Sequence, residues 1–299
     1  MSVNLLTDKA REIEALLDEV LPPVSTRPAP IHEAMRYAVL GGGKRLRAIM
    51  AVAACESVGG DGRQAHGLAA AVEMIHAYSL VHDDLPSMDD DDLRRGKPTV
   101  HRKYGEAVAI LTGDALLTAA FAELARMPEK YGIDFATTVA VIAELAEASG
   151  SQGMVGGQTA DILAAQAGAM ARDEVELLRY IHSHKTGALF TAVLRCGGMI
   201  GGASPRQLAS LTTYGEHFGL AFQITDDILD EIGSEAALGK ATRKDQAMGK
   251  LTYPRVFGLE QAKAMARESV RQCLQALDEL PEDTHILREL ALMVVERDR

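Results

Sequence analysis

Two groups of aspartates, far apart in the chain, are the residues best suited to do chemistry. The first lies in LVHDDLPSMDDDDLRRGKPT, residues 80–99, where six aspartates fall within ten positions and cations follow at once. The second lies in LAFQITDDILDEIG, residues 220–233, among apolar residues. One such group is usually a solvated acidic surface. Two groups on apolar segments instead predict bound magnesium, because unpaired carboxylates are costly to bury and magnesium takes oxygen ligands.

The spacing within each group predicts how its carboxylates meet. Asp83 and Asp89 are six residues apart, so an unbroken helix would turn them about 120° away from each other. Pro86 disrupts a helix, and a break over residues 85–88 would bring the two aspartates together. In the second group, Asp226 and Asp230 share one face of a helix at i, i+4 spacing. The predicted metal ligands are Asp83, Asp84, Asp89, Asp226, Asp227 and Asp230.

Basic residues stand beside both acid groups. A glycine turn in GGGKRLRA, residues 41–48, is expected to open a helix, which is a favourable place for an anion. A single cation is usually a surface residue, but this placement favours diphosphate groups held between magnesium and Arg or Lys. The candidates are Lys44, Arg45, Arg47, Arg94, Arg95, Lys185, Lys240, Lys244 and Lys250.

Other chemistries lack their sequence patterns. His182 and His184 are two residues apart and do not form the HExxH pattern of a zinc site. The chain contains neither a GxxxxGKS/T phosphate loop nor a GxSxG nucleophile elbow. The net charge of −11 argues against a nucleic-acid-binding surface, which is normally basic. The chemistry therefore belongs to metal, diphosphate and an apolar cavity that excludes water.

The elements that must position these residues are helices. Aromatic residues make up 4% of the chain, tryptophan is absent, and apolar residues recur at helical spacing without period-two alternation. No linker marks a boundary, so residues 1–299 are predicted to form a single all-α domain. Helices are expected near residues 5–20, from 30 to the glycines at 41–43, and near 44–58, 63–85, 106–126, 134–145, 154–167, 173–183, 189–200, 204–231, 254–277 and 284–297.

Cysteine usage and hydropathy bear on the compartment. Cys55, Cys196 and Cys273 are far apart and lie among apolar neighbours, which predicts buried free thiols in a reducing cytoplasm. The N-terminal segment is charged and lacks an apolar signal core. The longest apolar runs are interrupted short of a membrane span. We expect a soluble cytoplasmic protein without stable membrane insertion.

In its two acid groups and its glycine turn, the chain resembles the trans-isoprenyl diphosphate synthases, most closely the bacterial farnesyl diphosphate synthases. The resemblance runs from about residue 34 to the C-terminal ERDR. It implies an isoprenoid synthase-type orthogonal helical bundle around a central cavity, usually a homodimer, with three magnesium ions per site. The substrates implied are isopentenyl diphosphate and allylic diphosphates. The shared landmarks are GGGKRLR, HAYSLVHDDLPSMDDDDLRRGKPT, GDALL, GMVGGQTADI, HKTGALF and FQITDDILD.

The resemblance also implies a role for each site residue. The first acid group binds magnesium from one wall and the second from the other, with Asp83 and Asp226 the central ligands. Thr186 and Gln223 match groups that face the allylic cation. Arg243 stands where many relatives have glycine. The residues that match the family's positions for holding the allylic diphosphate are Arg94, Lys185, Lys240 and Lys250. The residues that match the positions for holding isopentenyl diphosphate are Lys44, Arg47, His76 and Arg95.

Product length is expected to depend on the residues just before the first acid group. Tyr78, next to Ser79, lies about 7.5 Å back along the helix from Asp83 at 1.5 Å per residue. A ring there would form the floor below a fifteen-carbon chain, although an ordinary core tyrosine explains it equally well. Longer-chain relatives tend to have smaller residues at this place. The resemblance therefore favours farnesyl diphosphate, with geranylgeranyl and geranyl diphosphate as alternatives.

Two rival functions start from the same acid groups. A terpene cyclase also ionises an allylic diphosphate with magnesium, but it is expected to carry an Asn/Ser/Glu metal pattern at its second site. It also needs no isopentenyl pocket, which Lys44, Arg47 and Arg95 indicate here. A non-catalytic partner subunit commonly lacks one acid group, and this chain has both. We therefore rank prenyl transfer by ionisation, condensation and proton elimination first.

Overall fold

A computed structural model of the chain describes residues 2–167, 174–232 and 251–296. Within these residues the chain is all-α apart from one two-stranded hairpin, as the sequence predicts. The chain forms two compact units, Met1–Val52 with Gly62–Ile142, and Ala53–Asp61 with Ala143–Arg299. One domain over residues 1–299 stays a prediction. The predicted residues Lys240, Arg243, Lys244 and Lys250 lie outside the described residues.

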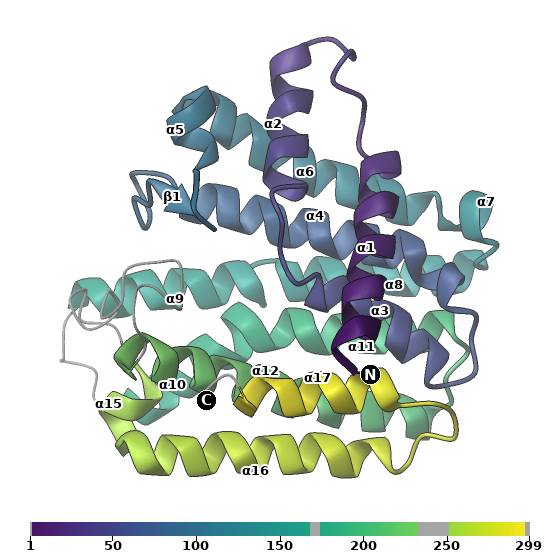
Figure 1. Ribbon diagram of the computed structural model, residues 1–299, viewed down its shortest axis with the longest axis vertical. Helices are drawn as coiled ribbons and strands as arrows, with labels where there is room; N and C mark the ends of the chain where they lie inside the picture. Colours follow the sequence, from purple (N-terminus) through teal and green to yellow (C-terminus); the bar gives the residue numbers. More distant parts are fainter. Residues whose placement is uncertain (1, 168–173, 233–250, 297–299) are drawn as a thin grey trace. The chain divides into compact units, whose positions relative to one another are not determined.

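The first unit is built on two long helices that run alongside each other, α4 and α6, with α2 crossing them (Figure 1). Its core consists of the apolar side chains that α4 and α6 bury against each other and their neighbours. The elements are α1 (Ser2–Val20), α2 (Ala29–Val39), α3 (Leu46–Glu56, which ends in the second unit), a 3-10 turn η1 (Gly62–Ala65), α4 (His66–Asp83), β1 (Leu93–Arg94), β2 (Lys97–Pro98), α5 (Val100–Tyr104), α6 (Glu106–Ala125) and α7 (Met127–Tyr131).

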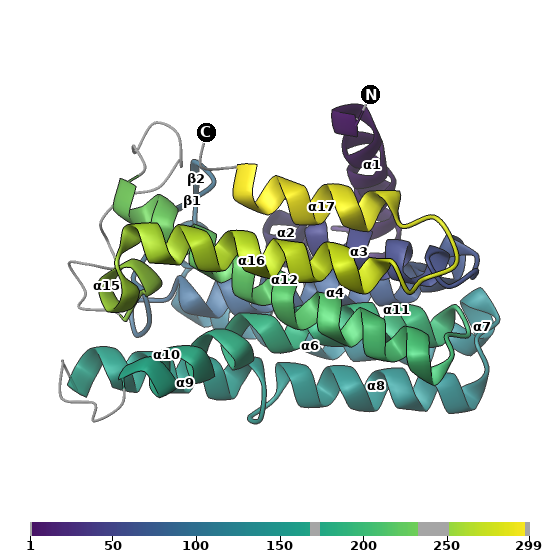
Figure 2. The same ribbon diagram turned by 90° about the horizontal axis from the view of Figure 1, so that it is seen from below.

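The second unit is built on the long helix α12, which packs against α11 and α16, while α17 lies beside α16 (Figure 2). Four stacked, tilted or edge-on aromatic pairs lie in and beside its core and join Phe190, Tyr214, Phe218 and Phe222. The elements are α8 (Phe135–Ser149, which begins in the first unit), α9 (Met154–Ala167), α10 (Glu174–His182), a π-helical turn η2 (Ser183–Gly187), α11 (Ala188–Ile200), α12 (Pro205–Ile232), α15 (Tyr253–Phe257), α16 (Leu259–Leu277) and α17 (His285–Glu296).

Most predicted helices are confirmed to within a few residues, and two differences have clear backbone causes. The helix expected over residues 254–277 is broken at Gly258, whose φ of 83° ends α15 and begins α16. The hairpin was not expected, because its two-residue turn is Arg95-Gly96, with φ of 52° and 73°. Turns with two positive φ values usually carry Asn-Gly or Asp-Gly. An arginine in the first position hides the signal.

The expectation that the longest apolar runs stop short of a membrane span is wrong for α6, which is long and apolar enough to cross a membrane by length and composition. This is weak evidence of a span, since core helices of globular proteins meet the same criteria. One face of α6 packs against α2, α4 and α5 in the first unit. The opposite face exposes Ile110 and Leu111 together with Asp114. A charged residue in the middle of that face fits a folded unit with an apolar surface better than a lipid-facing helix.

Candidate active site

The first acid group lies where α4 ends. Helix α4 stops at Asp83, and the chain then folds back so that the Asp89 amide donates to the Asp83 carbonyl at 2.8 Å. A second bond, from the Asp90 amide to the Leu85 carbonyl at 3.1 Å, closes the turn. The predicted break after residue 84 is therefore confirmed. It sets the backbone of Asp89 against that of Asp83, and both residues are half-buried.

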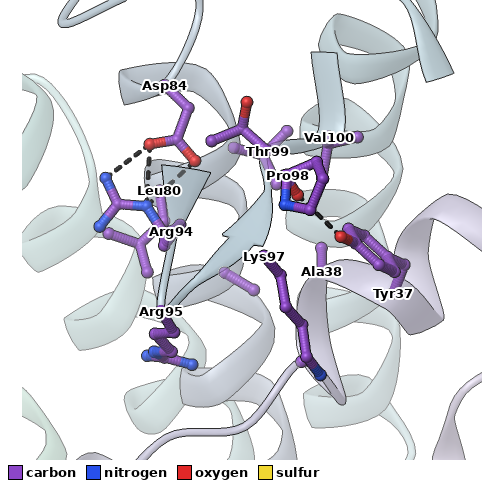
Figure 3. Close-up of a pocket in the computed structure, with 13 residues that line it drawn as sticks. Tyr37, Ala38, Leu80, Asp84, Arg94, Arg95, Lys97, Pro98, Thr99 and Val100 are labelled. Carbon is purple, nitrogen blue, oxygen red and sulfur yellow. Dashed lines mark hydrogen bonds and ion pairs between the residues drawn. The ribbon is translucent and has the colours of Figure 1, made fainter. Parts of the chain in front are cut away.

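Asp84 behaves differently from Asp83, because it is buried and bonded to Arg94. The Arg94 Nε atom donates to both carboxylate oxygens of Asp84, at 2.8 and 3.0 Å (Figure 3). Burial raises the pKa of Asp84, and the bonds and charge of Arg94 oppose that rise. Burial also lowers the pKa of Arg94, but the bonds and charge of Asp84 outweigh it. Asp84 therefore orients the guanidinium that the sequence assigns to the allylic diphosphate.

A pocket beside this pair is lined with cations. Its cavity volume is about 50 Å³, it opens to solvent, and it is bordered by Asp84, Arg94, Arg95 and Lys97 over an apolar floor from α4 and α2. Figure 3 shows Arg95 and Lys97 at the same side of the pocket, with the hairpin between them and Asp84. Arg94 lies with Asp84 on the other side of the hairpin. Arginine and lysine side chains bind phosphate groups well.

Arg95 reaches the glycine turn that precedes α3. Its guanidinium donates to the Gly42 carbonyl. Gly43 is required here, since a Cβ on it would lie 2.7 Å from the Arg95 Nη1 atom and its φ is 139°. The turn leaves Lys44 exposed and Arg47 half-buried in the first turn of α3. The structure thus brings the glycine turn to the hairpin, as a common diphosphate site requires.

His76 lies on α4 among the same cations. Burial lowers its pKa well below the ordinary range, and the charges of Arg47 and Arg95 lower it further. The imidazole is therefore neutral at physiological pH and offers a hydrogen-bond donor without adding charge. Ser79, one turn later, donates its hydroxyl to the His76 carbonyl at 2.9 Å.

Tyr78 is buried in the same helix. It is 6% exposed, and its ring meets the His82 ring edge-on with centroids 5.9 Å apart. Burial and the nearby charge of Asp83 raise the pKa of its hydroxyl to about 12. A buried neutral ring behind the first acid group is what the chain-length prediction requires.

In the second unit, the π-helical turn η2 carries Lys185 and Thr186. The Lys185 Nζ atom donates to Asp161 on α9 at 2.6 Å, and the Thr186 hydroxyl donates to the Gln223 side-chain carbonyl on α12 at 3.0 Å. Single-turn π-helices inside α-helices are frequent at functional sites. Here the turn aims two consecutive side chains at two different helices.

Two glycines make room for this turn. A Cβ on Gly157 of α9 would lie 2.1 Å from the Lys185 amide nitrogen. A Cβ on Gly219 of α12 would lie 2.8 Å from the Gly187 Cα atom. Both contacts are closer than atoms can approach without moving the backbone. The geometry of Lys185 and Thr186 therefore depends on glycine at both positions.

The second acid group lies on the unbroken helix α12. Asp226 is half-buried, while Asp227 and Asp230 are buried. Asp227 accepts a bond from the Gln223 side-chain amide at 3.1 Å and one from the Tyr253 backbone amide at 2.9 Å. Its two oxygens are thus engaged within the protein, in the way that Asp84 is engaged by Arg94.

The carboxylates fit magnesium rather than a metal that needs a full protein cage. Among the residues that the structure describes, no three His, Cys, Asp or Glu side chains form a group able to hold a metal. The acids come instead as pairs along the backbone: the Asp89 amide bonds to the Asp83 carbonyl, and Asp226 and Asp230 lie one turn apart on α12. Magnesium commonly takes one or two carboxylates and completes its shell with water and phosphate. Structural zinc needs four protein ligands, which these pairs do not supply.

Three residues that support the site were not predicted from the sequence. Asp161 holds Lys185, Glu73 is a buried acid on α4, and His182 packs against Tyr253 with ring centroids 5.3 Å apart. Burial lowers the pKa of His182 to about 3. The available signal was an ionisable residue inside an apolar helical run, as in AAAVEMIHAY. The predicted buried free thiols Cys55, Cys196 and Cys273 are confirmed.

Comparisons with known proteins identify the family. Residues 28–290 match the polyprenyl synthetase family. The chain is 46% identical to farnesyl diphosphate synthase of Escherichia coli K12 over 97% of this chain and 96% of that protein. It is 45% identical to a chloroplastic geranylgeranyl pyrophosphate synthase of Capsicum annuum, over 91% of this chain and 72% of that protein.

Solved structures give the same result. A crystal structure of an FPP/GFPP synthase from Zymomonas mobilis matches with a TM-score of 0.87 and 38% identity, covering 99% of this chain and all of that one. Geranylgeranyl pyrophosphate synthetase from Pyrococcus horikoshii matches with a TM-score of 0.86 and 33% identity, covering 98% of this chain and 97% of that one. With its all-α fold and its two acid groups, the chain belongs to the polyprenyl synthetase family and is a trans-prenyltransferase.

Proposed function

We propose that this prenyltransferase condenses isopentenyl diphosphate with dimethylallyl and then geranyl diphosphate, and releases farnesyl diphosphate. The observation that carries the fifteen-carbon product is Tyr78, a buried ring on α4 that lies five residues before Asp83. The full-length match to the Escherichia coli farnesyl enzyme supports it. Geranylgeranyl diphosphate is the alternative, favoured by the names of the Capsicum and Pyrococcus relatives.

The family generally depends on magnesium, and the acid pairs are the residues we assign to hold it. Asp83 and Asp89 in the first unit and Asp226 and Asp230 in the second would supply the oxygen ligands of three ions. Bound magnesium would neutralise the charge that develops on the departing pyrophosphate. Asp84 and Asp227, which the resemblance also makes metal ligands, accept hydrogen bonds from protein donors, and we propose that they keep these neighbours in place.

The remaining steps belong to side chains of this chain. Arg94, held by Asp84, and Lys185, held by Asp161, donate charge-assisted hydrogen bonds to the allylic diphosphate as its C–O bond breaks. Thr186 and Gln223 turn their dipoles toward the resulting cation. The double bond of isopentenyl diphosphate attacks that carbon, and a proton then leaves to the released pyrophosphate. Arg95, Arg47, Lys44 and His76 hold the attacking substrate.

We also propose a homodimer in the cytoplasm. The support is four exposed apolar side chains of the first unit, Ile110 and Leu111 on α6 and Phe135 and Val139 on α8, which we propose form one apolar face. Phe135 is 78% exposed, which is unusual for so large an apolar side chain on a free surface. The cytoplasmic compartment is supported by the three free thiols.

The test is a timed incubation of the protein with magnesium, dimethylallyl diphosphate and isopentenyl diphosphate, followed by chromatography of the dephosphorylated products. A fifteen-carbon end product is expected. Accumulation of the twenty-carbon alcohol would replace farnesyl by geranylgeranyl diphosphate. A cyclised hydrocarbon formed from farnesyl diphosphate alone would indicate a terpene cyclase. No elongation would overturn the proposal.

A further inference from the structure

A strained turn precedes α3 and carries the cations assigned to isopentenyl diphosphate. Gly42 and Gly43 have φ values of 99° and 139°, and Arg45 has a φ of 52°. Glycine adopts such backbone freely, but arginine does not. Arg45 is also only 5% exposed, although arginine is seldom buried without partners. Something must therefore hold this residue in an unfavourable conformation.

Arg45 is held by three neighbouring elements of the first unit. Its Nη2 atom donates to the Val39 carbonyl at the end of α2 at 2.8 Å. The Nη1 atom donates to Glu73 on α4 at 3.3 Å, and Nη2 also reaches Glu14 on α1 at 3.4 Å. These contacts tie the turn to α1, α2 and α4 at once.

Glu73 bonds both to the turn and to the helix that follows it. It is 5% exposed. One carboxylate oxygen accepts the bond from Arg45, and the other accepts a bond from the Ala48 amide in the first turn of α3 at 3.3 Å. One acid thus fixes both the turn and the start of the helix after it. Buried ion pairs add little net stability compared with apolar packing, so this pair calls for an explanation other than stability.

The residues around the pair are the ones assigned to one substrate. Lys44 and Arg47 flank Arg45 and Leu46 in sequence. His76 follows Glu73 by three residues on α4, and the charges of Arg47, Arg95, Arg94 and Arg45 all act on its imidazole. Arg95 bonds to the turn at Gly42, and the charge of Glu73 acts on Arg95 in the opposite sense to that of Arg45.

We propose that Arg45 and Glu73 are positioning residues for the diphosphate of isopentenyl diphosphate. They do not touch the substrate. They hold the turn in the one conformation that presents Lys44, Arg47 and Arg95 together, and the Glu73 carboxylate offsets the repulsion between these crowded cations. This inference rests on the proposed function, because it assigns a role within the isopentenyl diphosphate site.

The test is Glu73→Gln, which keeps the shape of the side chain and removes its charge. A charge-assisted bond contributes enough that its loss should raise the KM for isopentenyl diphosphate about tenfold or more. The KM for geranyl diphosphate and the kcat should change less than about threefold, because neither depends on this turn. Calorimetric titration of isopentenyl diphosphate without the allylic substrate should show the same loss in binding.

Glu123→Gln is the matched control. Glu123 is a buried acid of the same unit, 2% exposed and bonded to Lys130 at 2.7 Å, but it lies on α6 away from the glycine turn. Its variant should lower the melting temperature while both KM values stay unchanged. Should Glu73→Gln fail to fold, Arg45→Lys, which keeps the charge but loses the forked geometry, carries the same test.

The outcomes separate this inference from the proposed function. A wild-type protein that does not elongate dimethylallyl diphosphate refutes the proposed function itself. An active wild type whose folded Glu73→Gln variant, or Arg45→Lys in its place, binds isopentenyl diphosphate normally refutes the positioning role. Equal rises in both KM values would also refute it, since they would show general damage to the fold. A selective rise for isopentenyl diphosphate supports it.

Discussion

The two acid groups bring the backbones of their aspartates close together by opposite routes. In the first group a helix must end, because Asp83 and Asp89 meet only after the chain folds back over residues 85–88. In the second group the helix must continue, because Asp226 and Asp230 share a face only while α12 is unbroken. Spacing decides which route is possible: six residues require a break, whereas four require a helix.

In both groups the second aspartate is buried and accepts hydrogen bonds from protein donors. Asp84 and Asp227 each follow the first aspartate directly, each is buried, and each is bonded to protein donors. The donors differ in kind. Asp84 holds a charged side chain of the hairpin, while Asp227 holds a backbone amide and the Gln223 amide. The comparison suggests that the first aspartates bind metal, whereas the second ones position neighbouring groups.

The largest effect is expected from the first aspartates. Asp83→Ala and Asp226→Ala should each lower kcat by about 10²–10³-fold or more, since each removes a ligand of the metal that stabilises the leaving group. Steady-state incorporation of labelled isopentenyl diphosphate measures the loss, with circular dichroism to confirm folding. Asp92→Ala, an exposed aspartate of the same acidic run, is the control. Near-normal turnover in either variant would remove that residue from the metal site.

Substitutions of the two second aspartates should affect different properties, substrate binding for Asp84 and stability for Asp227. Asp84→Asn weakens the bonds that hold Arg94. The KM for geranyl diphosphate should rise about tenfold, because this corresponds to the free energy of one charged hydrogen bond. Asp227→Asn should instead lower the free energy of unfolding by about 1–3 kcal/mol, because it weakens a buried backbone contact. Parallel kinetics and urea unfolding of both variants test the contrast. Identical profiles for the two variants would contradict the predicted difference between a substrate-positioning and a stabilising aspartate.

A third difference lies five residues before each group, where the first has Tyr78 and the second has Ala221. We expect Tyr78→Ala to yield products of twenty or more carbons and to lower stability by about 3 kcal/mol through the cavity it leaves. Chromatography of the end products measures the change. Tyr78→Phe keeps the ring and should still give fifteen carbons. An unchanged product from Tyr78→Ala would locate chain-length control elsewhere.

The exposed apolar face belongs to the first unit, so association should depend on that unit. Leu111→Glu places a charge in the proposed dimer interface and should turn the dimer into a monomer. Light scattering after size-exclusion chromatography reports the mass. Leu292→Glu, at an exposed leucine of α17 in the second unit, should leave the dimer intact. A wild-type protein that is already monomeric would contradict the interface.

Burial lowers the pKa of His76 in the first unit and of His182 in the second, and this predicts a pH dependence of stability. The folded-state pKa of His182 lies at about 3, below its ordinary 6.5, because it is buried; that of His76 is also lowered. Their contribution to stability is complete above pH 6.5 and is lost as the pH falls, because the unfolded chain binds protons first. Each histidine should cost about 1.4 kcal/mol per pH unit in this range.

Urea unfolding at pH 7.5 and 5.5 measures this loss. His182→Gln cannot bind the proton, so its unfolding midpoint should fall less between the two pH values than that of the wild type. The same shift in both proteins would show that His182 does not contribute to the dependence.

Local chemistry made much of the fold predictable. Helix α1 ends before Pro22-Pro23, and α2 begins with Pro30 in its first turn, both as expected. The break after Asp84 followed from Pro86 and from the spacing of the aspartates. The short helices α5 and α7 and the division at Gly258 were missed. Five-residue helices carry too little periodicity to be read from sequence, and glycine interrupts many helices without ending them.

The supporting residues could not be predicted, because their partners are distant in sequence. Glu73 meets Arg45 across 28 positions, and Lys185 meets Asp161 across 24. A buried acid in an apolar helix indicates that a partner exists, but helical spacing says nothing about which residue it is. The strained φ of Arg95 likewise shows only in the folded hairpin.

The amino-acid sequence by itself determined the chemistry: which residues carry negative charge, at what spacing, and next to which cations. Those properties are local, because spacing along a helix sets which side chains share a face. Only the tertiary structure decided that Asp84 and Asp227 are held by protein donors, that η2 departs from the α-helix, and that Glu73 fixes the glycine turn. Such contacts depend on the packing of helices far apart in the chain, where a few tenths of an ångström decide which atoms bond.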